Sequence, residues 1–230
     1  MLARFLSPSS YFAALDRLGI VVTRDLAGSL WKLEGSARGL HIDGFRTLVV
    51  IGRPTIRVAY GSRIEIGRGV VLMSSSRFCL SASLYAPIKL ITHTSSAAIS
   101  IGAGASLNGT SVVCRSSRIV IGARTMVGPN AVIVDSPYHP LWPLDARNRY
   151  PGTHLDREVE IGDDVWIGMQ VIVLPGAKIG SGTVIGAGSI VSGEIPPNCL
   201  AVGRPARVVR RLDATMNAAE RETFAATTVP

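Results

Sequence analysis

Long apolar runs are missing from this sequence of 230 residues, although 47% of its residues are hydrophobic and only 17% are charged. No uninterrupted apolar stretch approaches the ~18 residues that a membrane-spanning helix needs. The first residues, MLARFLSPSS, lack the apolar core of a secretion signal, so no targeting segment is expected. The length suits a single domain. We therefore expect a one-domain protein of the cytoplasm.

Cysteine and aromatic residues are also scarce. The three cysteines, Cys79, Cys114 and Cys199, lie far apart without a CxxC spacing, and an odd number cannot all pair within one chain. Reduced thiols are the preferred interpretation. Aromatic residues make up 6% of the chain and do not alternate with arginines, which argues against a nucleic-acid partner. The net charge of +8 still favours an anionic partner, and both a phosphorylated ligand and peripheral contact with a membrane stay open.

A six-residue repeat runs through residues 159–194. The third place of each repeat is always aliphatic: Ile161, Ile167, Val173, Ile179, Ile185 and Val191. Glycine follows this place in four of the six repeats. The same pattern can be traced earlier in the chain: Ile66, Ile101, Leu107, Val113, Ile121, Val127 and Ile133. A period of six fits neither a helix nor a simple alternating strand.

This period suits a short strand followed by a corner, where glycine permits backbone angles that other residues reach only with strain. Three such sides close a coil of about 18 residues, and stacked coils place each aliphatic residue over its equivalent one coil earlier. The sequence therefore predicts an all-β fold, a parallel β-helix with a core column of Ile and Val. The terminal coils need covers.

Two interruptions and the chain ends define the expected boundaries. The step from Val113 to Ile121 is eight residues, and the step from Ile133 to Ile161 is 28. Residues 134–158 contain four prolines and should form a projecting loop. Residues 1–40 should form a helical or irregular cap, with Ser9 or Ser10 as a helix N-cap. Residues 41–205 should be the β-helix, and residues 206–230 a tail or helix opening at Asp213.

Several motifs occur together between about Ile99 and Arg211: HP in the loop, VEIGDDVWIG, VLPGAKIG, VIGAGSIVSGEIPPN and VGRPARVVR. As a set they resemble the hexapeptide-repeat acyltransferases, and among these the maltose and galactoside acetyltransferase group that O-acetylates sugars and polysaccharide precursors. The resemblance implies a left-handed parallel β-helix, a homotrimer, acetyl-coenzyme A as co-substrate, no metal, and a sugar or glycan acceptor. Amino-sugar N-acetylation and a non-catalytic binding scaffold are the alternatives.

The resemblance also assigns catalytic residues. The histidine of the family's HP motif is the general base, and His139 matches it, whereas His154 has no such match and is interpreted as a loop residue. Asp135 could hold the histidine ring in one tautomer or cap the turn at the start of the loop, and both interpretations stay open. Asn108 matches an acceptor-orienting asparagine of related enzymes; the alternative is a corner asparagine with a left-handed backbone.

The coenzyme residues follow from the same resemblance. A backbone N–H at the corner Gly168-Met169 should stabilise the oxyanion, in analogy with the family's corner after VWIG. Ala187 and Ser192 stand at places where the pantetheine arm lies in the family, and small residues allow a close approach to the backbone. Trp166, just before this corner, is interpreted as a packing or subunit-contact residue.

Arginines follow near the chain's C-terminal end. Arg207 and Arg210 stand where the family meets the nucleotide end of the coenzyme, and arginine can bind a phosphate with two donors. The family often has lysine where Gly193 stands. A β-helical carbonic anhydrase is a further alternative, but its zinc needs closely spaced histidines, and His139 and His154 are 15 residues apart.

Overall fold

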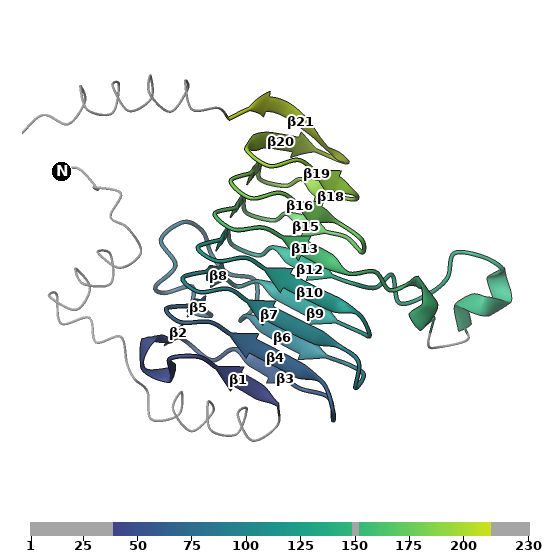
Figure 1. Cartoon of the computed structure of the whole chain (residues 1–230), viewed down its shortest axis with the longest axis horizontal. Coiled ribbons are helices and arrows are strands. Elements are labelled where there is room, and N and C mark those ends of the chain that lie inside the picture. The colour runs from purple at the N-terminus through teal and green to yellow at the C-terminus, as the bar shows by residue number, and fades with distance from the viewer. Residues whose placement is uncertain (1–38, 149–151, 213–230) are drawn as a thin grey trace, which may run out of the picture.

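The computed structural model describes residues 39–148 and 152–212, which form a three-sided prism of stacked strands (Figure 1). The helices expected near Ser9 or Ser10 and from Asp213 lie outside the described residues. Helical structure in the described ranges is limited to short 3-10 helices: η1 (Phe45–Thr47), η2 (Leu144–Asn148) and η3 (Thr153–Leu155). Within these ranges, no helix has the length and hydropathy needed to cross a bilayer.

Three sheets form the sides of the prism, and we name them A, B and C in the order in which the chain visits them. Sheet A contains β1 (Leu40–Ile42), β4 (Arg63–Ile66), β7 (Ala98–Ile101), β10 (Arg118–Ile121), β13 (Val159–Ile161), β16 (Lys178–Ile179) and β19 (Glu194–Ile195). Sheet B contains β2 (Val49–Ile51), β5 (Val71–Met73), β8 (Ser106–Asn108), β11 (Met126–Val127), β14 (Trp166–Ile167), β17 (Val184–Ile185), β20 (Cys199–Gly203) and β21 (Ala206–Arg211). Sheet C contains β3 (Thr55–Arg57), β6 (Lys89–Thr92), β9 (Ser111–Cys114), β12 (Val132–Val134), β15 (Ile172–Val173) and β18 (Ile190–Val191).

The predicted aliphatic column is confirmed. Its six members are each at most 3% exposed: Ile161, Ile167, Val173, Ile179, Ile185 and Val191. Parallel pairing stacks Ile161 on Ile179 in sheet A, and sheets B and C stack their members in the same way. Full burial of one such side chain stabilises the fold by about 1.5–3 kcal/mol. Every coil therefore depends on its neighbours for its core contacts.

The glycines after the column serve a purpose other than the predicted one. The left-handed backbone occurs two residues later, for example at Asp164 (φ 55°) and Gln170 (φ 57°), and not at the glycines of the repeat. A Cβ on Gly168 would lie 2.6 Å from the backbone nitrogen of Ala187 in the next coil, closer than such atoms can pack. These glycines are needed because consecutive coils approach closely at the corners.

The assignment of Val113 to the core is wrong. Val113 is half-buried, whereas Val112 is fully buried and pairs with Ile133. The corner between β8 and β9 is one residue shorter than its equivalent in the next coil, because Leu107 and Val112 are five residues apart whereas Val127 and Ile133 are six apart, so the inward place comes one residue earlier. The long step seen in the sequence arises because β9 and β10 have four residues each where β15 and β16 have two, and the corner between β9 and β10 is formed by residues 115–117.

The segment from residue 206, expected to be a tail or helix, begins with a strand. β21 runs antiparallel to β20, whereas the coils are joined only by parallel pairs. Ala206 at its start is buried, and the rest of the strand is exposed. β21 therefore extends sheet B beyond the last coil and covers the edge that β20 would otherwise leave open.

Two loops leave the coils at different edges of the prism. Residues 135–158 connect β12 to β13 at the edge between sheets C and A, and Figure 1 shows the described parts of this loop, residues 135–148 and 152–158, extending away from the prism. Residues 74–88 connect β5 to β6 at the edge between sheets B and C. We call these edges the C–A edge and the B–C edge.

Candidate active site

The residues predicted to perform chemistry divide between the two edges. At the B–C edge, the chain turns at residues 109–110, 128–131, 168–171 and 186–189. At the C–A edge, it turns at residues 115–117, 135–158, 174–177 and 192–193. The B–C edge holds or adjoins Asn108, Gly168, Met169 and Ala187. The C–A edge holds Asp135, His139 and Ser192. Sheet C lies between the two groups.

His139 is exposed on the projecting loop, and its ring is held by the backbone. Its Nδ1 lies 2.8 Å from the carbonyl oxygen of Arg147. A carbonyl only accepts hydrogen bonds, so Nδ1 carries the proton and Nε2 keeps the basic lone pair in the neutral ring. The guanidinium of Arg147 donates from Nε and Nη2 to the carbonyl of Leu141, at 3.1 and 3.0 Å, which ties the two sides of the loop together.

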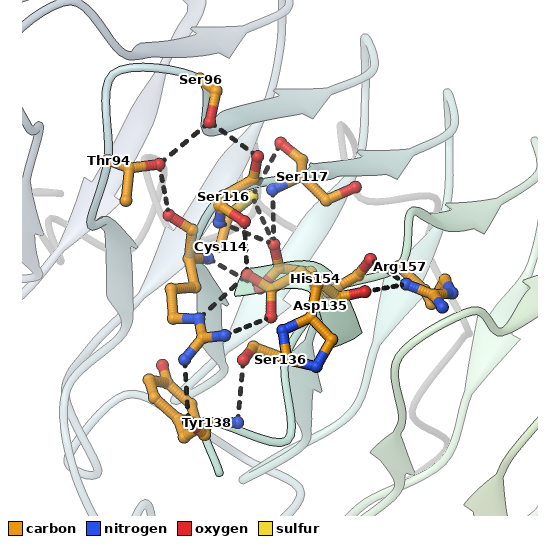
Figure 2. Close-up of polar contacts among 12 residues, drawn as sticks. Thr94, Ser96, Cys114, Ser116, Ser117, Asp135, Ser136, Tyr138, His154 and Arg157 are labelled. Atoms are coloured by element: carbon orange, nitrogen blue, oxygen red, sulfur yellow. Dashed lines mark hydrogen bonds and ion pairs between the residues drawn. The ribbon is translucent and has the colours of Figure 1, made fainter. Parts of the chain in front are cut away.

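Asp135 holds the C–A corner of the preceding coil. It is fully buried, its Oδ1 accepts from the N–H of Arg115 at 2.7 Å, and its Oδ2 accepts from the N–H groups of Ser116 and Ser117 at 3.1 and 2.8 Å (Figure 2). The suggestion that Asp135 orients the histidine ring is therefore corrected, because the carbonyl of Arg147 does so. The corner of residues 115–117 needs these acceptors, since its N–H groups turn away from any strand ladder.

Arg115 and Asp156 form an ion pair inside the protein, with side chains 0% and 1% exposed. The guanidinium donates from Nε and Nη2 to the two carboxylate oxygens, at 2.9 and 2.8 Å. Ser116 Oγ also donates to this carboxylate. On the other side, Arg157 N donates to the Asp135 carbonyl at 2.8 Å. Both ends of the projecting loop are thus attached to the same corner.

Tyr138, the residue before His139, has a left-handed backbone with φ 65°. A non-glycine residue adopts this conformation at some cost, so the surrounding contacts must hold it. Arg115 Nη1 donates to the Tyr138 carbonyl at 2.9 Å, and the guanidinium lies 5.5 Å from the centre of the ring. Tyr138 N donates to Ser136 Oγ at 2.9 Å (Figure 2). These contacts set the direction in which the chain enters His139.

The buried ion pair of Arg115 and Asp156, which we call the anchor of the loop, stays charged. Burial alone would raise the pKa of Asp156, but hydrogen bonds from Arg115, Ser116 and Ser136 outweigh it, and the pKa lies below the usual value. Burial and the nearby Asp135 carboxylate strongly raise the pKa of Cys114, which stays a thiol and donates from Sγ to Asp135 at 3.3 Å. Cys114 is accordingly no nucleophile.

At the B–C edge, the N–H groups of Gly168 and Met169 differ in their hydrogen bonding. The N–H of Gly168 donates to the Ile185 carbonyl at 2.8 Å, so the stacking of the coils uses it. Among the described residues, no acceptor reaches the N–H of Met169, and the residue as a whole is 39% exposed. One coil earlier, Pro129 occupies the corresponding place after Gly128, so the fold needs no donor there. Met169 is thus the donor of this corner that remains available to a ligand.

The other coenzyme candidates lie further along the prism. Ala187 and Ser192 are both exposed and flank β18, one at each edge of sheet C. Arg207 and Arg210 are exposed on β21. Arg204 lies at the B–C edge, where its Nε donates to the Gly188 carbonyl at 2.6 Å.

Asn108 is the last residue of β8 and does not have the left-handed backbone considered for it; Gly109 does, with φ 53°. Asn108 Nδ2 donates to the Val127 carbonyl at 2.9 Å, and the main-chain carbonyl of Asn108 accepts from Asn130 N at 3.0 Å. No donor of the described residues reaches its Oδ1. The side chain is therefore oriented by the next coil and keeps one acceptor atom.

Sequence reasoning missed two parts of this region. The role of Arg115 could not be predicted from the irregular step in which it lies, because no repeat indicates that its buried partner is 41 residues away. The loop 74–88, with Tyr85 at its end, could have been found from the gap in the repeat between Ile66 and Ile101. In the described part of the chain, no group of three or more His, Cys, Asp or Glu side chains gathers as a metal site requires.

Comparison with known proteins identifies the repeat. Residues 158–193 match a family profile described as bacterial transferase hexapeptide (six repeats). Residues 158–193 therefore carry the hexapeptide repeats that this transferase profile describes. The crystal structure of the polysialic acid O-acetyltransferase OatWY superposes with a TM-score of 0.60 at 20% identity, over 75% of this chain and 85% of that chain. The all-β, left-handed parallel β-helix predicted from the sequence is confirmed.

Curated relatives match part of the chain. Galactoside O-acetyltransferase of Lactococcus lactis is 40% identical over 115 residues, 50% of this chain and 54% of the relative. A Schizosaccharomyces pombe protein, provisionally named an acetyltransferase, is 47% identical over 95 residues, 41% of this chain and 44% of the relative. The chain thus spans about half the length of the curated relatives it matches.

Proposed function

We propose that this protein transfers an acetyl group from acetyl-coenzyme A to a hydroxyl of a sugar or surface-polysaccharide precursor. The observation that carries the proposal is the hydrogen bond between His139 Nδ1 and the Arg147 carbonyl, which leaves Nε2 as a base. The galactoside O-acetyltransferase relative supports a sugar acceptor. A ring held in this way on a projecting loop contributes little to stability.

In the proposed reaction, His139 Nε2 takes the proton of the acceptor hydroxyl while that oxygen forms a bond to the thioester carbonyl carbon. The carbonyl oxygen becomes an oxyanion, and the N–H of Met169 donates to it. The C–S bond then breaks, and His139 returns its proton to the departing thiolate. The products are an acetyl ester and free coenzyme A, and the histidine is restored.

The coenzyme would extend from Met169 towards the last coil. Its thioester lies at Met169, its pantetheine arm passes Ala187 on the same edge, and its phosphates reach Arg207 and Arg210 on β21; Ser192, on the C–A edge, would face the arm from a neighbouring copy. This direction is supported by the exposure of these residues and by the basic character of β21. Arginine forks suit phosphate oxygens.

A homotrimer would complete the site. His139 and Met169 come from opposite edges of sheet C. Taking four strand residues of ~3.3 Å each as the width of this sheet, the two edges are about 13 Å apart. A base must lie within ~3 Å of the proton it removes, so His139 of one copy would serve Met169 of the next. Apolar side chains on the outer faces of sheets B and C support such packing: Met126 is 44% exposed, Trp166 53% and Ile172 36%.

Substitutions at the two edges test this arrangement. Chains carrying Met169→Pro lack the oxyanion donor, and chains carrying His139→Ala lack the base. Mixed assemblies of the two variants should regain activity that neither has alone, because some sites then combine His139 of one copy with Met169 of another. If mixing restores nothing although mixed trimers form, the site is not shared.

The test of the function itself is an assay of the purified chain with acetyl-coenzyme A. The acceptors are methyl glycosides of galactose, glucose and mannose, together with glucosamine. We expect sugar-dependent release of the coenzyme thiol and a product that loses its acetyl group to hydroxylamine, as an ester does. A hydroxylamine-resistant product from glucosamine alone would indicate N-acetylation. Absence of a thermal shift with saturating coenzyme A would contradict the proposal.

A further inference from the structure

The loop of residues 74–88 lies along the B–C edge, the same edge that carries Met169. It leaves the prism after β5 and returns at β6, beside β8 (Figure 1). Ser76 Oγ closes the loop by accepting from Leu84 N at 2.9 Å, and the Leu84 side chain packs on Gly109 of the next coil. The loop therefore follows the edge towards later coils.

Asn130 fixes this loop one coil further along. Its Oδ1 accepts from Tyr85 N at 2.8 Å, and its Nδ2 donates to the Ser83 carbonyl at 3.0 Å. Asn130 itself has a left-handed backbone, φ 63°, at its corner. One amide side chain thus satisfies two backbone groups of a loop 45 or more residues away in sequence.

Tyr85 extends from this clamp to the following coil, where Gln170 Nε2 donates to its hydroxyl. Gln170 directly follows Met169. The tyrosine is held at its backbone by Asn130 and at its hydroxyl by Gln170, yet it is 74% exposed. An aromatic ring that is fixed at both ends but mostly uncovered adds little to the core. Because the ring is already ordered, binding a ligand against it costs little further side-chain conformational entropy.

We infer that Tyr85 forms a wall of the acceptor subsite and packs against the apolar C–H face of a pyranose ring. The inference rests on the proposed function, in which the coenzyme occupies the edge from Met169 towards β21. The acceptor must then approach Met169 from the other side. On that side the same edge presents Tyr85, and two coils before Met169 it presents Asn108, whose Oδ1 can accept from a sugar hydroxyl.

The test uses sugar binding as well as turnover, so that the two proposals can fail separately. Saturation-transfer NMR with methyl β-D-galactopyranoside, on protein saturated with coenzyme A, reports the ring protons in contact with the protein. We expect clear transfer in the wild type and in Tyr85→Phe, and its loss in Tyr85→Ala. Tyr60→Ala serves as the control, because Tyr60 is 99% exposed and lies three coils before the loop that carries His139.

In turnover, Tyr85→Ala should raise the KM for the sugar about tenfold and leave the KM for acetyl-coenzyme A unchanged. Sugar binding that depends on Tyr85 without any acetyl transfer would overturn the proposed function and keep the subsite. Acetyl transfer with an unchanged sugar KM in Tyr85→Ala would overturn the subsite and keep the function. No sugar signal in the wild type, with either glucose or mannose glycosides in place of galactose, would also overturn the subsite.

Discussion

Arg115 and Asp156 meet in a buried two-point ion pair that joins the corner of residues 115–117 to the end of the projecting loop. The guanidinium also binds the carbonyl of Tyr138, at the start of that loop. A single side chain therefore fixes both ends of the segment that carries His139. This is the physical link between the prism and the proposed base.

Asp156→Asn should destabilise the protein strongly, because it leaves the buried guanidinium without its counter-charge. Breaking such a pair costs about 3–5 kcal/mol. The matched control is Asp164→Asn, which removes the partner of Arg124 from an exposed pair and should change little. Urea unfolding midpoints of the two variants compare the effects, and equal midpoints would contradict the anchor.

The same carboxylate should make the anchor sensitive to acid. The pKa of Asp156 is lower in the folded protein than its usual value of about 3.9, so its stabilising effect is present above that value. The effect is lost as the pH falls through the lower folded pKa. The gap in stability between wild type and Asp156→Asn should therefore be largest near neutral pH and shrink below about pH 4. A gap that persists unchanged into strong acid would refute this.

Met169→Pro should lower kcat about 10²- to 10³-fold, because it removes one donor to the oxyanion. The fold should tolerate it, since Pro129 already stands at the corresponding corner of the preceding coil. Met169→Ala keeps the N–H and should retain activity within a few-fold. Steady-state kinetics of both variants, with thermal melting as a check on folding, make the comparison. Equal losses in the two would assign the effect to the side chain.

Arg207→Ala combined with Arg210→Ala should raise the KM for acetyl-coenzyme A roughly tenfold through lost phosphate contacts. Acetyl-pantetheine lacks the nucleotide, so its KM should stay the same in this variant. The KM values for the two donors are measured side by side. If acetyl-coenzyme A shows no change, the nucleotide end binds elsewhere, and Arg204 beside Gly188 is the next residue to test.

The parts of the fold that repeat were predictable from the sequence. A residue such as Ile167 faces the core in every coil, so its burial appears as a period. Val113 was misassigned because one corner is shorter by one residue, and corner length leaves no trace in an aliphatic pattern. The pairings of Arg115 with Asp156 and of Asn130 with the loop at Tyr85 could not be predicted, because each joins polar residues far apart in sequence at a single place.

The most direct measurement is the kcat of His139→Ala for acetyl transfer, with His154→Ala as the control from the same loop. Both histidines are exposed, so neither change should lower the melting temperature. We predict that kcat falls about 10²- to 10⁴-fold in His139→Ala and stays near the wild-type value in His154→Ala. A His139→Ala variant that keeps nearly full kcat would contradict the proposal that this histidine is the base.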